Sequence, residues 1–336
     1  MLNKLEFNKP LVSLIITCHN LGKYLLECIK SIENQSYKNF EIIIVDDASD
    51  SSTKEIIEKN FKNKSAIAKF FNSTDIRVID IKKNEGQMGA FLQGLKIARG
   101  EFICMIDADD VLYRDYLSTL VQAHMNTSVA FISAAQSEID ENSTIHCLNS
   151  IASPTFKNEG GIFKKAEPSK IFSTDFEEFE VKKITHKECA FGEWAWNPST
   201  SAMMRKSALE FLFLFKDTQN YKTGADKFIF TFLHLLGSSA TVSVPLYAYR
   251  RHGNNCSNAN PVMGDFRYLK PEAVERIVNW NKKIHINMLK FIFSNYSYFC
   301  ARLNPMNTKK LIFRIIFSFN FRVLKRAMKA LLFKLS

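Results

Sequence analysis

The 336-residue sequence lacks the features that mark several large classes of protein. Its 12 glycines and 8 prolines, together with 46% hydrophobic residues, exclude a fibrous or disordered chain. The seven cysteines are scattered and never spaced Cys-x-x-Cys, which argues against a disulfide framework or a thiolate zinc site and favours a reducing cytoplasm. No window holds the roughly 18 apolar residues that a membrane span needs, and residues 1–10 do not resemble a signal peptide.

Two common phosphate-binding motifs are also missing. The first predicted strand is not followed by Gly-x-Gly-x-x-Gly, which argues against a dinucleotide dehydrogenase. No Gly-x-x-x-x-Gly-Lys-Ser/Thr loop is present, which argues against a P-loop enzyme. If the protein binds phosphates, we expect a metal ion to hold them.

Positive charge is concentrated at one end of the chain. The net charge is +11, and residues 309–336 hold eight basic residues and no acidic one, so the other 308 residues together carry +3. This distribution argues against a uniformly basic nucleic-acid-binding protein.

The first 135 residues alternate between apolar, β-branched runs and segments with helical periodicity. Strands are predicted at 11–17, 40–45, 76–81, 102–106 and 129–134, with helices between them. Continuous apolar strands joined by helices are typical of a parallel sheet covered on both faces. The sequence therefore predicts an α/β fold with a mostly parallel sheet.

The pattern weakens from about 136 to 190, where polar residues predict a loop-rich insertion. Beyond it we predict a strand at 199–204, a helix at 226–236, a strand at 240–249 and a helical tract from about 272 to the end.

Polar clusters follow three of the predicted strands. They are residues 17–20 (TCHN), 46–50 (DDASD) and 107–110 (DADD). Because the carboxyl ends of parallel strands meet at one edge, these clusters are expected on a common rim, where so many carboxylates call for a divalent cation. Asp107 and Asp109 are two residues apart and would share a face, and oxygen ligands favour Mg²⁺ or Mn²⁺. The alternative is that these aspartates cap helices and form turns.

Four motifs, taken together, resemble the nucleotide-sugar half of the family 2 glycosyltransferases, which have the Rossmann-like GT-A fold. They are residues 10–20 (PLVSLIITCHN), 45–49 (VDDAS), 84–86 (NEG) and 102–110 (FICMIDADD). The resemblance implies that Asp107 contacts the ribose and that Asp109, the second acid of the Asp-x-Asp motif, binds the metal. It assigns the rest of donor binding, including the base, to Thr17, His19, Asn20, Asp47, Asn84 and Gly86. The sequence departs from the family with His19 where Tyr is usual and Phe91 where many members have Arg.

The second half resembles the family more loosely. Residues 221–226 (YKTGAD) are similar to the family's Gly-Glu-Asp stretch, which implies that Asp226 is the general base. The alternative is an acid that complements the first turn of a helix. Residues 249–257 (YRRHGNNCS) resemble a segment that brings His252 to the metal, although Arg250 or Arg251 could instead meet phosphate oxygens.

Trp194 and Trp196 are candidates for an acceptor platform because indole rings stack on sugar faces, although paired tryptophans beside a strand also suit a core. The Gln-x-x-Arg-Trp motif of processive synthases is not present in the chain, which favours transfer of one sugar per encounter.

The C-terminal tract has the pattern of a basic amphipathic helix. A helical wheel places Ile312 and Ile316 with the apolar residues, and Lys310 and Arg314 with the basic ones. Such a helix can lie in an anionic leaflet, or it can pack on the domain with a solvated basic face.

These observations predict a GT-A enzyme with a C-terminal helical extension. Residues 1–135 would bind the nucleotide sugar, 136–260 would hold the acceptor and the base, and 261–336 would form the helical extension. We expect a metal-dependent, inverting transferase that uses Mn²⁺ or Mg²⁺ and moves a sugar, with UDP-sugar favoured, to a glycan or lipid-linked glycan in cell-surface polysaccharide synthesis. We expect the protein in the cytoplasm, bound peripherally to the inner face of the cytoplasmic membrane through residues 309–336. We expect no nucleic acid partner. The alternatives are a sugar nucleotidyltransferase and a non-catalytic basic protein that binds membrane or nucleic acid.

Overall fold

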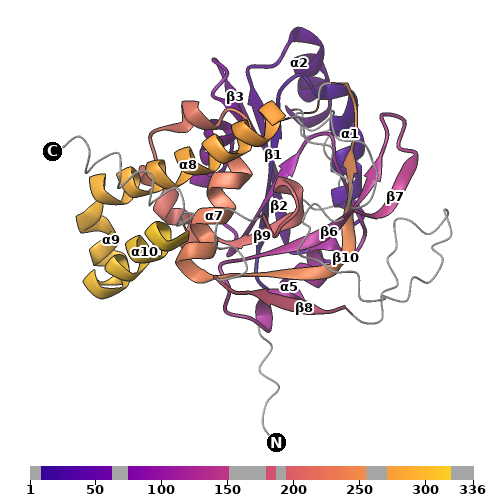
Figure 1. Cartoon of the computed structure of the whole chain (residues 1–336). Helices are drawn as coiled ribbons and strands as arrows, with labels where there is room; N and C mark the ends of the chain where they lie inside the picture. The colour runs from indigo at the N-terminus through magenta and orange to yellow at the C-terminus, as the bar shows by residue number, and fades with distance from the viewer. Residues whose placement is uncertain are drawn as a thin grey trace, which may run out of the picture.

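A computed structural model of the chain describes residues 9–62, 75–150, 179–186, 194–253, 255 and 271–318. These residues form a central sheet with helices on both of its faces (Figure 1). Among the helices of this described part, none is both long and apolar enough to cross a membrane.

Ten strands make up the sheet in the described residues, and its central strands are the apolar runs at the start of the chain. The order β3-β2-β1-β4-β9-β6-β10-β5 is parallel from β3 to β4 and again between β6 and β10, whereas β9 runs antiparallel between β4 and β6. β7 pairs with β6, and β8 pairs with β10. The strands are β1 (Val12–Cys18), β2 (Phe40–Asp47), β3 (Asp75–Ile81), β4 (Phe102–Asp107), β5 (Val111–Leu112), β6 (Phe131–Ile139), β7 (Ile145–Ser150), β8 (Val181–Ile184), β9 (Ala202–Arg205) and β10 (Ser239–Arg250).

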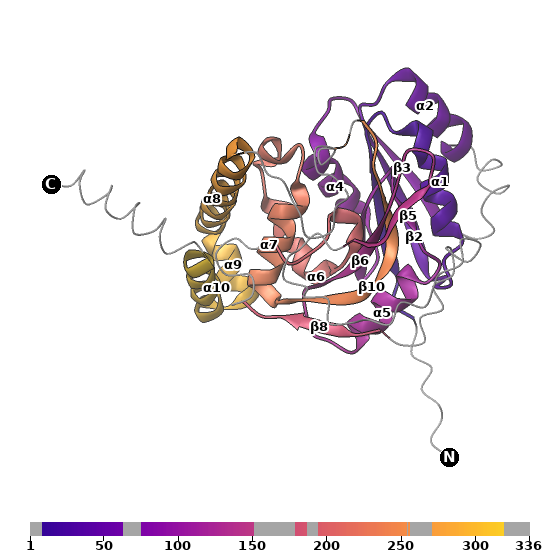
Figure 2. The same cartoon turned by 45° about the vertical axis from the view of Figure 1, so that its right-hand side comes forward.

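The helices form two layers because successive side chains of a strand point to opposite faces. Leu14 and Ile16 of β1 belong to the core on the side of α1 and α5, whereas Ile15 belongs to the core that contains α4 and α7. In Figure 2, α8 and α10 lie outside α7, on the side away from the sheet. The helices are α1 (Gly22–Glu33), α2 (Ser51–Ile57), α4 (Gly86–Ile97), α5 (Tyr116–Met125), α6 (Lys206–Leu209), α7 (Ala225–Gly237), α8 (Pro271–Ser294), α9 (Tyr296–Leu303) and α10 (Pro305–Ser318). Short helical turns are the π-helical η1 (Glu58–Lys62) and the 3₁₀ turns η4 (Ser199–Ser201), η5 (Glu210–Leu214) and η6 (Thr218–Tyr221).

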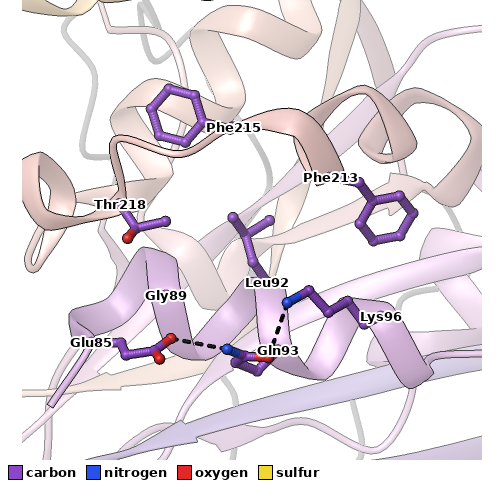
Figure 3. Close-up of a pocket in the computed structure, with 8 residues that line it drawn as sticks. All are labelled: Glu85, Gly89, Leu92, Gln93, Lys96, Phe213, Phe215 and Thr218. Carbon is purple, nitrogen blue, oxygen red and sulfur yellow. Dashed lines mark hydrogen bonds between the residues drawn. The ribbon is translucent and has the colours of Figure 1, made fainter. Parts of the chain in front are cut away.

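A cavity of about 190 Å³ lies between α4 and the segment that includes η5 and η6 (Figure 3). Gln93 of α4 donates to Glu85 at 3.1 Å, and Lys96 donates to Gln93 at 3.2 Å. Phe213, Phe215 and the other lining residues include none of the predicted site residues.

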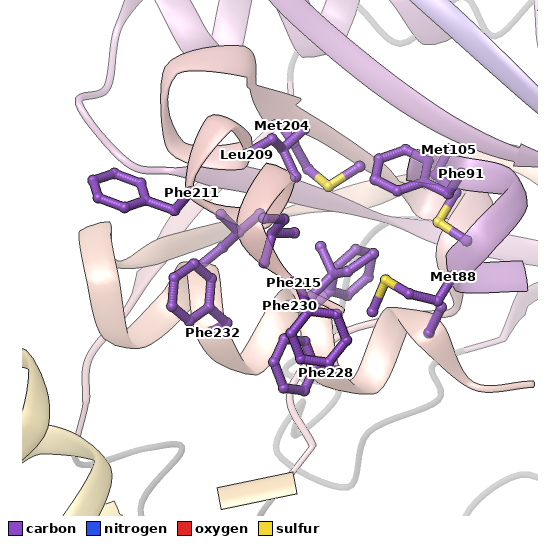
Figure 4. Close-up of a cluster of buried hydrophobic side chains, with 14 of the residues drawn as sticks. Met88, Phe91, Met105, Met204, Leu209, Phe211, Phe215, Phe228, Phe230 and Phe232 are labelled. Atoms are coloured by element: carbon purple, nitrogen blue, oxygen red, sulfur yellow. The ribbon is translucent and has the colours of Figure 1, made fainter. Parts of the chain in front are cut away.

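Aromatic side chains fill the core between α4 and α7 (Figure 4). Phe228 lies 4.5 Å from Phe215 between ring centroids, and Phe230 stacks on Phe131 at 4.8 Å. Phe91 is fully buried in the same cluster, so it packs α4 against the core.

The predicted central strands and their helices are confirmed, but the region after 135 is more ordered than we predicted. β6 continues to Ile139, and β7 and β8 both lie between 136 and 190. Each of these two strands pairs antiparallel with a neighbour, and antiparallel strands can leave one face in water. They can therefore carry polar side chains and lack a continuous apolar run. Parts of the predicted insertion, 151–178 and 187–193, lie outside the described residues.

The C-terminal extension is helical. The wheel is right for Ile312, which packs against the core, and for Lys310, which is exposed, but it is wrong for Arg314. α10 buries Leu311 and Ile315 against the core. Arg314 turns inward, where its Nη1 donates to the carbonyl oxygen of Leu235 at 2.8 Å. The rest of the predicted amphipathic tract, 319–336, lies outside the described residues.

Gly94 allows α4 to pack closely on β1. A Cβ at this position would lie 2.4 Å from Cγ2 of Ile15 and 3.1 Å from Cγ2 of Val45. Because such overpacking forces backbone shifts, we expect Gly94→Ala to lower the free energy of unfolding by about 1–3 kcal/mol, as measured by urea denaturation. The control is Gly253→Ala, since nothing lies within 4 Å of a Cβ there, and equal stability of the two variants would contradict the expectation.

Candidate active site

The predicted donor residues meet at the carboxyl ends of β1, β2 and β4. In the sheet register, Thr17 of β1 pairs with Val45 of β2 on one side and with Asp107 of β4 on the other. Parallel pairing therefore brings the ends of three strands to the rim that the sequence predicted.

The loop after β1 is tied to the loop after β2. Asn20 has a positive φ of 57°, its N–H donates to Oγ of Ser49 at 3.0 Å, and its Oδ1 accepts from the N–H of Asp50 at 2.7 Å. Nδ1 of His19 lies 2.7 Å from the carbonyl oxygen of Asp47. Because the His19 side chain is exposed, its ring has a face open to solvent beside the rim.

Asp47 holds the start of α4. Its two carboxylate oxygens accept from the N–H groups of Glu85 and Gly86, each at 2.7 Å. The N–H groups at the start of a helix have no acceptor within the helix, and the positive end of the helix dipole there favours a negative charge. Asn84 is half-buried in the loop just before them.

Gly86 is required by the backbone at this point. Its φ is +75°, and a Cβ there would lie 2.3 Å from Cα of Lys222. The N–H of Gln87 donates to the carbonyl oxygen of Lys222 at 2.9 Å. The start of α4 and the segment that leads into α7 are therefore in direct contact.

Asp107 is half-buried, and each of its carboxylate oxygens accepts one hydrogen bond. Oδ1 accepts from Nε2 of Gln87 at 3.0 Å, Oδ2 accepts from Oγ of Ser199, and the N–H of Asp107 donates to Oγ1 of Thr200 at 3.0 Å. Burial, followed by the charge of Asp109, raises the pKa of Asp107 to about 7.

Asp109 and His252 come together although they are 143 residues apart. Oδ2 of Asp109 lies 2.8 Å from Nε2 of His252 and 3.4 Å from Nδ2 of Asn255. The Asp109 side chain is only 9% exposed and that of His252 only 6%. The ring of Tyr24 lies 5.1 Å from that of His252.

Arg250 and Asp110 support the Asp109 loop from behind. Arg250 is fully buried: its Nε donates to the carbonyl oxygen of Asp109 at 2.7 Å, its Nη2 donates to Glu27 at 2.6 Å, and its N–H donates to Oδ1 of Asp110 at 3.0 Å. Burial, followed by the charge of Asp109, raises the pKa of the Asp110 carboxyl well above its usual value. Arg250 thus has no exposed surface for a phosphate, and Arg251 forms an ion pair with Glu138.

Asp109 and His252 fit a divalent cation that is shared with a substrate. In the described part of the chain, no three His, Cys, Asp or Glu side chains gather so that they could hold a metal by themselves. Asp109 and His252 bring one carboxylate oxygen and one imidazole nitrogen together. Mg²⁺ at nucleotide sites needs only one or two protein carboxylates, because phosphates and water fill its other positions.

Asp226 is the second residue of α7 and is half-buried. The helix begins after Gly224, which has a φ of +69°, and Oδ1 of Asp226 accepts from the N–H of Lys227 at 2.9 Å. Burial raises the pKa of Asp226 above its usual value. Since its charge in turn raises the pKa of Asp107, the two carboxylates are close enough to interact.

Gln87 connects the two halves of the site, and the sequence analysis missed it. Its Nε2 donates to Asp107 at 3.0 Å, while its Oε1 accepts from the N–H of Ala225 at 3.0 Å. Its position directly after the motif at 84–86 was the available signal, but a single glutamine carries no distinctive spacing.

The predicted acceptor platform is wrong for Trp196. Its side chain is only 3% exposed, it packs against Phe131, and its Nε1 donates to Oγ of Ser239 at 2.9 Å. Trp194 is half-buried and stacks on Phe230 at 5.8 Å. Both rings pack against the hydrophobic core, because burial of the indole surface stabilises the fold.

An acidic rim on a sheet of this topology, with a second acid on a facing helix, defines a GT-A glycosyltransferase architecture. The sequence model named glycosyl transferase family 2 matches residues 13–213, and the chain belongs to this family.

Named relatives match about a third of the chain. Glycosyltransferase GlyG of Streptococcus pneumoniae serotype 4 is 34% identical over 112 residues, which are 33% of this chain and 34% of GlyG. The GalNAc(5)-diNAcBac-PP-undecaprenol beta-1,3-glucosyltransferase of Campylobacter jejuni is 36% identical over 113 residues, which are 34% of each chain. The match thus spans about a third of the length of either relative.

Solved structures share the fold. The S. aureus TarS 1–349 structure with UDP-GlcNAc has a TM-score of 0.52 at 17% identity, over 93% of this chain and 82% of that one. The structure of the same TarS segment with UDP has a TM-score of 0.51 at 17% identity, over 83% of this chain and 65% of that one.

Arg250 should contribute strongly to stability, because loss of its buried guanidinium removes the donor to the carbonyl oxygen of Asp109 and breaks the ion pair with Glu27. We expect Arg250→Met to lower the free energy of unfolding by about 3–5 kcal/mol. The control is Arg302→Met, which removes a largely exposed ion pair with Glu210 and should cost at most about 1 kcal/mol. Denaturation that gives similar losses for both variants would contradict the role of Arg250.

Proposed function

We propose that the protein transfers one sugar from a nucleotide sugar, with UDP-sugar favoured, to a hydroxyl of a glycan or lipid-linked glycan in cell-surface polysaccharide synthesis. The observation that carries the proposal is the link from Asp107 through Gln87 to the first turn of α7, which holds Asp226 beside the donor rim. A donor site and a base next to each other are what a direct transfer needs.

In this proposal the nucleotide lies along the ends of β1, β2 and β4. Thr17, His19 and Asp47 contact the base, with the open face of His19 available for stacking. Each Asp47 oxygen accepts one backbone hydrogen bond and has a second lone pair for a ring N–H. The same site includes Asn20, Asn84, Gly86 and, at the ribose, Asp107.

Asp109 and His252 would hold Mn²⁺ or Mg²⁺ on the diphosphate. A divalent ion supplies charge neutralisation to a nucleoside diphosphate leaving group. Arg250 fixes the backbone of Asp109 from behind, so this carboxylate has a defined position before any ligand binds.

Asp226 would act as the general base. A carboxylate with a raised pKa accepts a proton from an attacking hydroxyl more readily than an ordinary one does. Attack from the side opposite the leaving diphosphate is a single displacement, which inverts the anomeric centre.

The names of similar proteins support the substrate class. The Campylobacter jejuni relative is named for glucosyl transfer to an undecaprenol-linked glycan, and TarS structures contain UDP or UDP-GlcNAc. By analogy we assign donor binding to residues 1–135, acceptor and base to 136–260, and a cytoplasmic location at the inner face of the membrane. The sheet itself is continuous across the boundary at 135.

Replacement of the base separates chemistry from donor binding. We expect Asp226→Asn to lower acceptor-dependent UDP release by about 10²- to 10⁴-fold, while the affinity for UDP, measured by calorimetry, changes little. The matched control is Asp217→Asn, an exposed acid nearby on the same segment. Wild-type turnover in Asp226→Asn would refute its assignment as the base.

The same base predicts the direction of the pH dependence. Asp226 must be ionised to accept a proton, and its pKa lies above the usual value, so kcat/KM should fall on acidification at a higher pH than an ordinary aspartate would give. A kcat/KM profile that stays flat down to the usual range of aspartate would argue against Asp226.

Removal of either proposed metal ligand should weaken metal-dependent donor binding. We expect Asp109→Ala and His252→Ala each to reduce the Mn²⁺-dependent affinity for UDP by at least about tenfold. Loss of a residue that only hydrogen-bonds a metal ligand already lowers metal affinity by about tenfold or more. Calorimetry with Mn²⁺ and with EDTA measures this effect. Glu141→Ala, an exposed acid, is the control. Equal UDP affinity in EDTA and in Mn²⁺ would exclude the assigned metal site.

A further inference from the structure

The helices α8 and α10 each have one face in the core and one face in solvent. α8 buries Ile284, Met288 and Ile292, whereas Ile286 and Phe293 are exposed. α8 packs on α7 and α10, and α10 also packs on α7. In Figure 2 both helices lie outside α7, on the side away from the sheet.

The exposed face of α10 is apolar although it is not covered by the described chain. Met306 is 78% exposed, Phe313 57% and Phe317 56%. The rings of Phe313 and Phe317 lie 3.9 Å apart between centroids, one helical turn from each other. They form a single apolar patch rather than scattered side chains, and such a patch marks an interaction site.

Exposed lysines lie on the same two helices as this patch, and the stretch 282–318 contains no acidic residue. Residues 282–318 contain seven basic residues and no Asp or Glu. Arg314 points inward and Arg302 pairs with Glu210, which leaves five exposed lysines on α8 and α10. These are Lys282, Lys283, Lys290, Lys309 and Lys310.

We propose that the outer face of α8 and α10 docks the protein on an anionic lipid surface. Aromatic rings that enter the headgroup region, flanked by lysines that meet lipid phosphates, are the chemistry of interfacial helices. The acid-free stretch 282–318 complements a negatively charged leaflet. This inference rests on the proposed function, because docking on a membrane would bring the enzyme to a lipid-linked acceptor. The contact would be made by helices that already pack against the core.

The test is flotation of the full chain with vesicles of phosphatidylcholine alone or with 30% phosphatidylglycerol. We expect binding only to the anionic vesicles, and its loss in high salt. The variants Phe313→Ser/Phe317→Ser and Lys309→Gln/Lys310→Gln should each lower the partition coefficient at least tenfold. All four positions are exposed, and melting temperatures near that of the wild type verify that these variants are folded.

Matched controls lie on the other layer of helices. Met125→Ser removes a side chain of α5 that is 67% exposed, and Lys30→Gln/Lys54→Gln removes two exposed charges from α1 and α2. These controls should bind vesicles as the wild type does. The catalytic variant Asp226→Asn should also float normally, so failure of the proposed reaction and failure of docking give different results.

Three results would overturn the proposal. The first is that the wild-type protein does not bind anionic vesicles. The second is that the patch variants bind them as well as the wild type does. The third is that the wild type is a dimer without vesicles and the Phe313→Ser/Phe317→Ser variant is a monomer. The last result would assign the face to a second copy of the chain.

Discussion

Three carboxylates within four residues, Asp107, Asp109 and Asp110, must be accommodated where β4 leaves the sheet. Burial and mutual repulsion both disfavour their charged forms, as the raised pKa values of Asp107 and Asp110 show. Donors from distant segments stabilise the cluster. Gln87 and Ser199 donate to the Asp107 carboxylate, and Arg250 donates to the backbone carbonyl oxygen of Asp109 and to the carboxylate of Asp110. Much of the architecture around the site exists to hold this cluster in place.

The same hydrogen bonds join the two functional halves. Gln87 bonds Asp107 with one end of its amide and the start of α7 with the other, and Gly86 contacts Lys222 closely. A displacement of α7 would therefore shift Gln87 and change its hydrogen bond to Asp107. We regard the donor and acceptor sides as one mechanical unit, in keeping with a sheet that runs through both without interruption.

How much could be predicted depended on the kind of signal. β1, β2 and β4 were predictable because apolar, β-branched runs have few alternatives, and the convergence of their acidic ends follows from parallel pairing. β7 and β8 were missed because short antiparallel strands can be polar. Gln87 and Arg250 were missed as structural links because their partners lie far away in the sequence. Trp196 was misjudged because an indole suits a core as well as a sugar, and Arg314 was misjudged because a helical wheel cannot show the Leu235 carbonyl that it meets.

Asp47 restricts how this protein could be re-engineered. Its carboxylate anchors the first N–H groups of α4, so replacing it to change nucleotide preference would also loosen the helix that carries Gln87. The exposed His19 side chain meets the carbonyl oxygen of Asp47 through Nδ1 at 2.7 Å but anchors no helix. A library aimed at altered donor choice should therefore vary His19 and keep Asp47 constant.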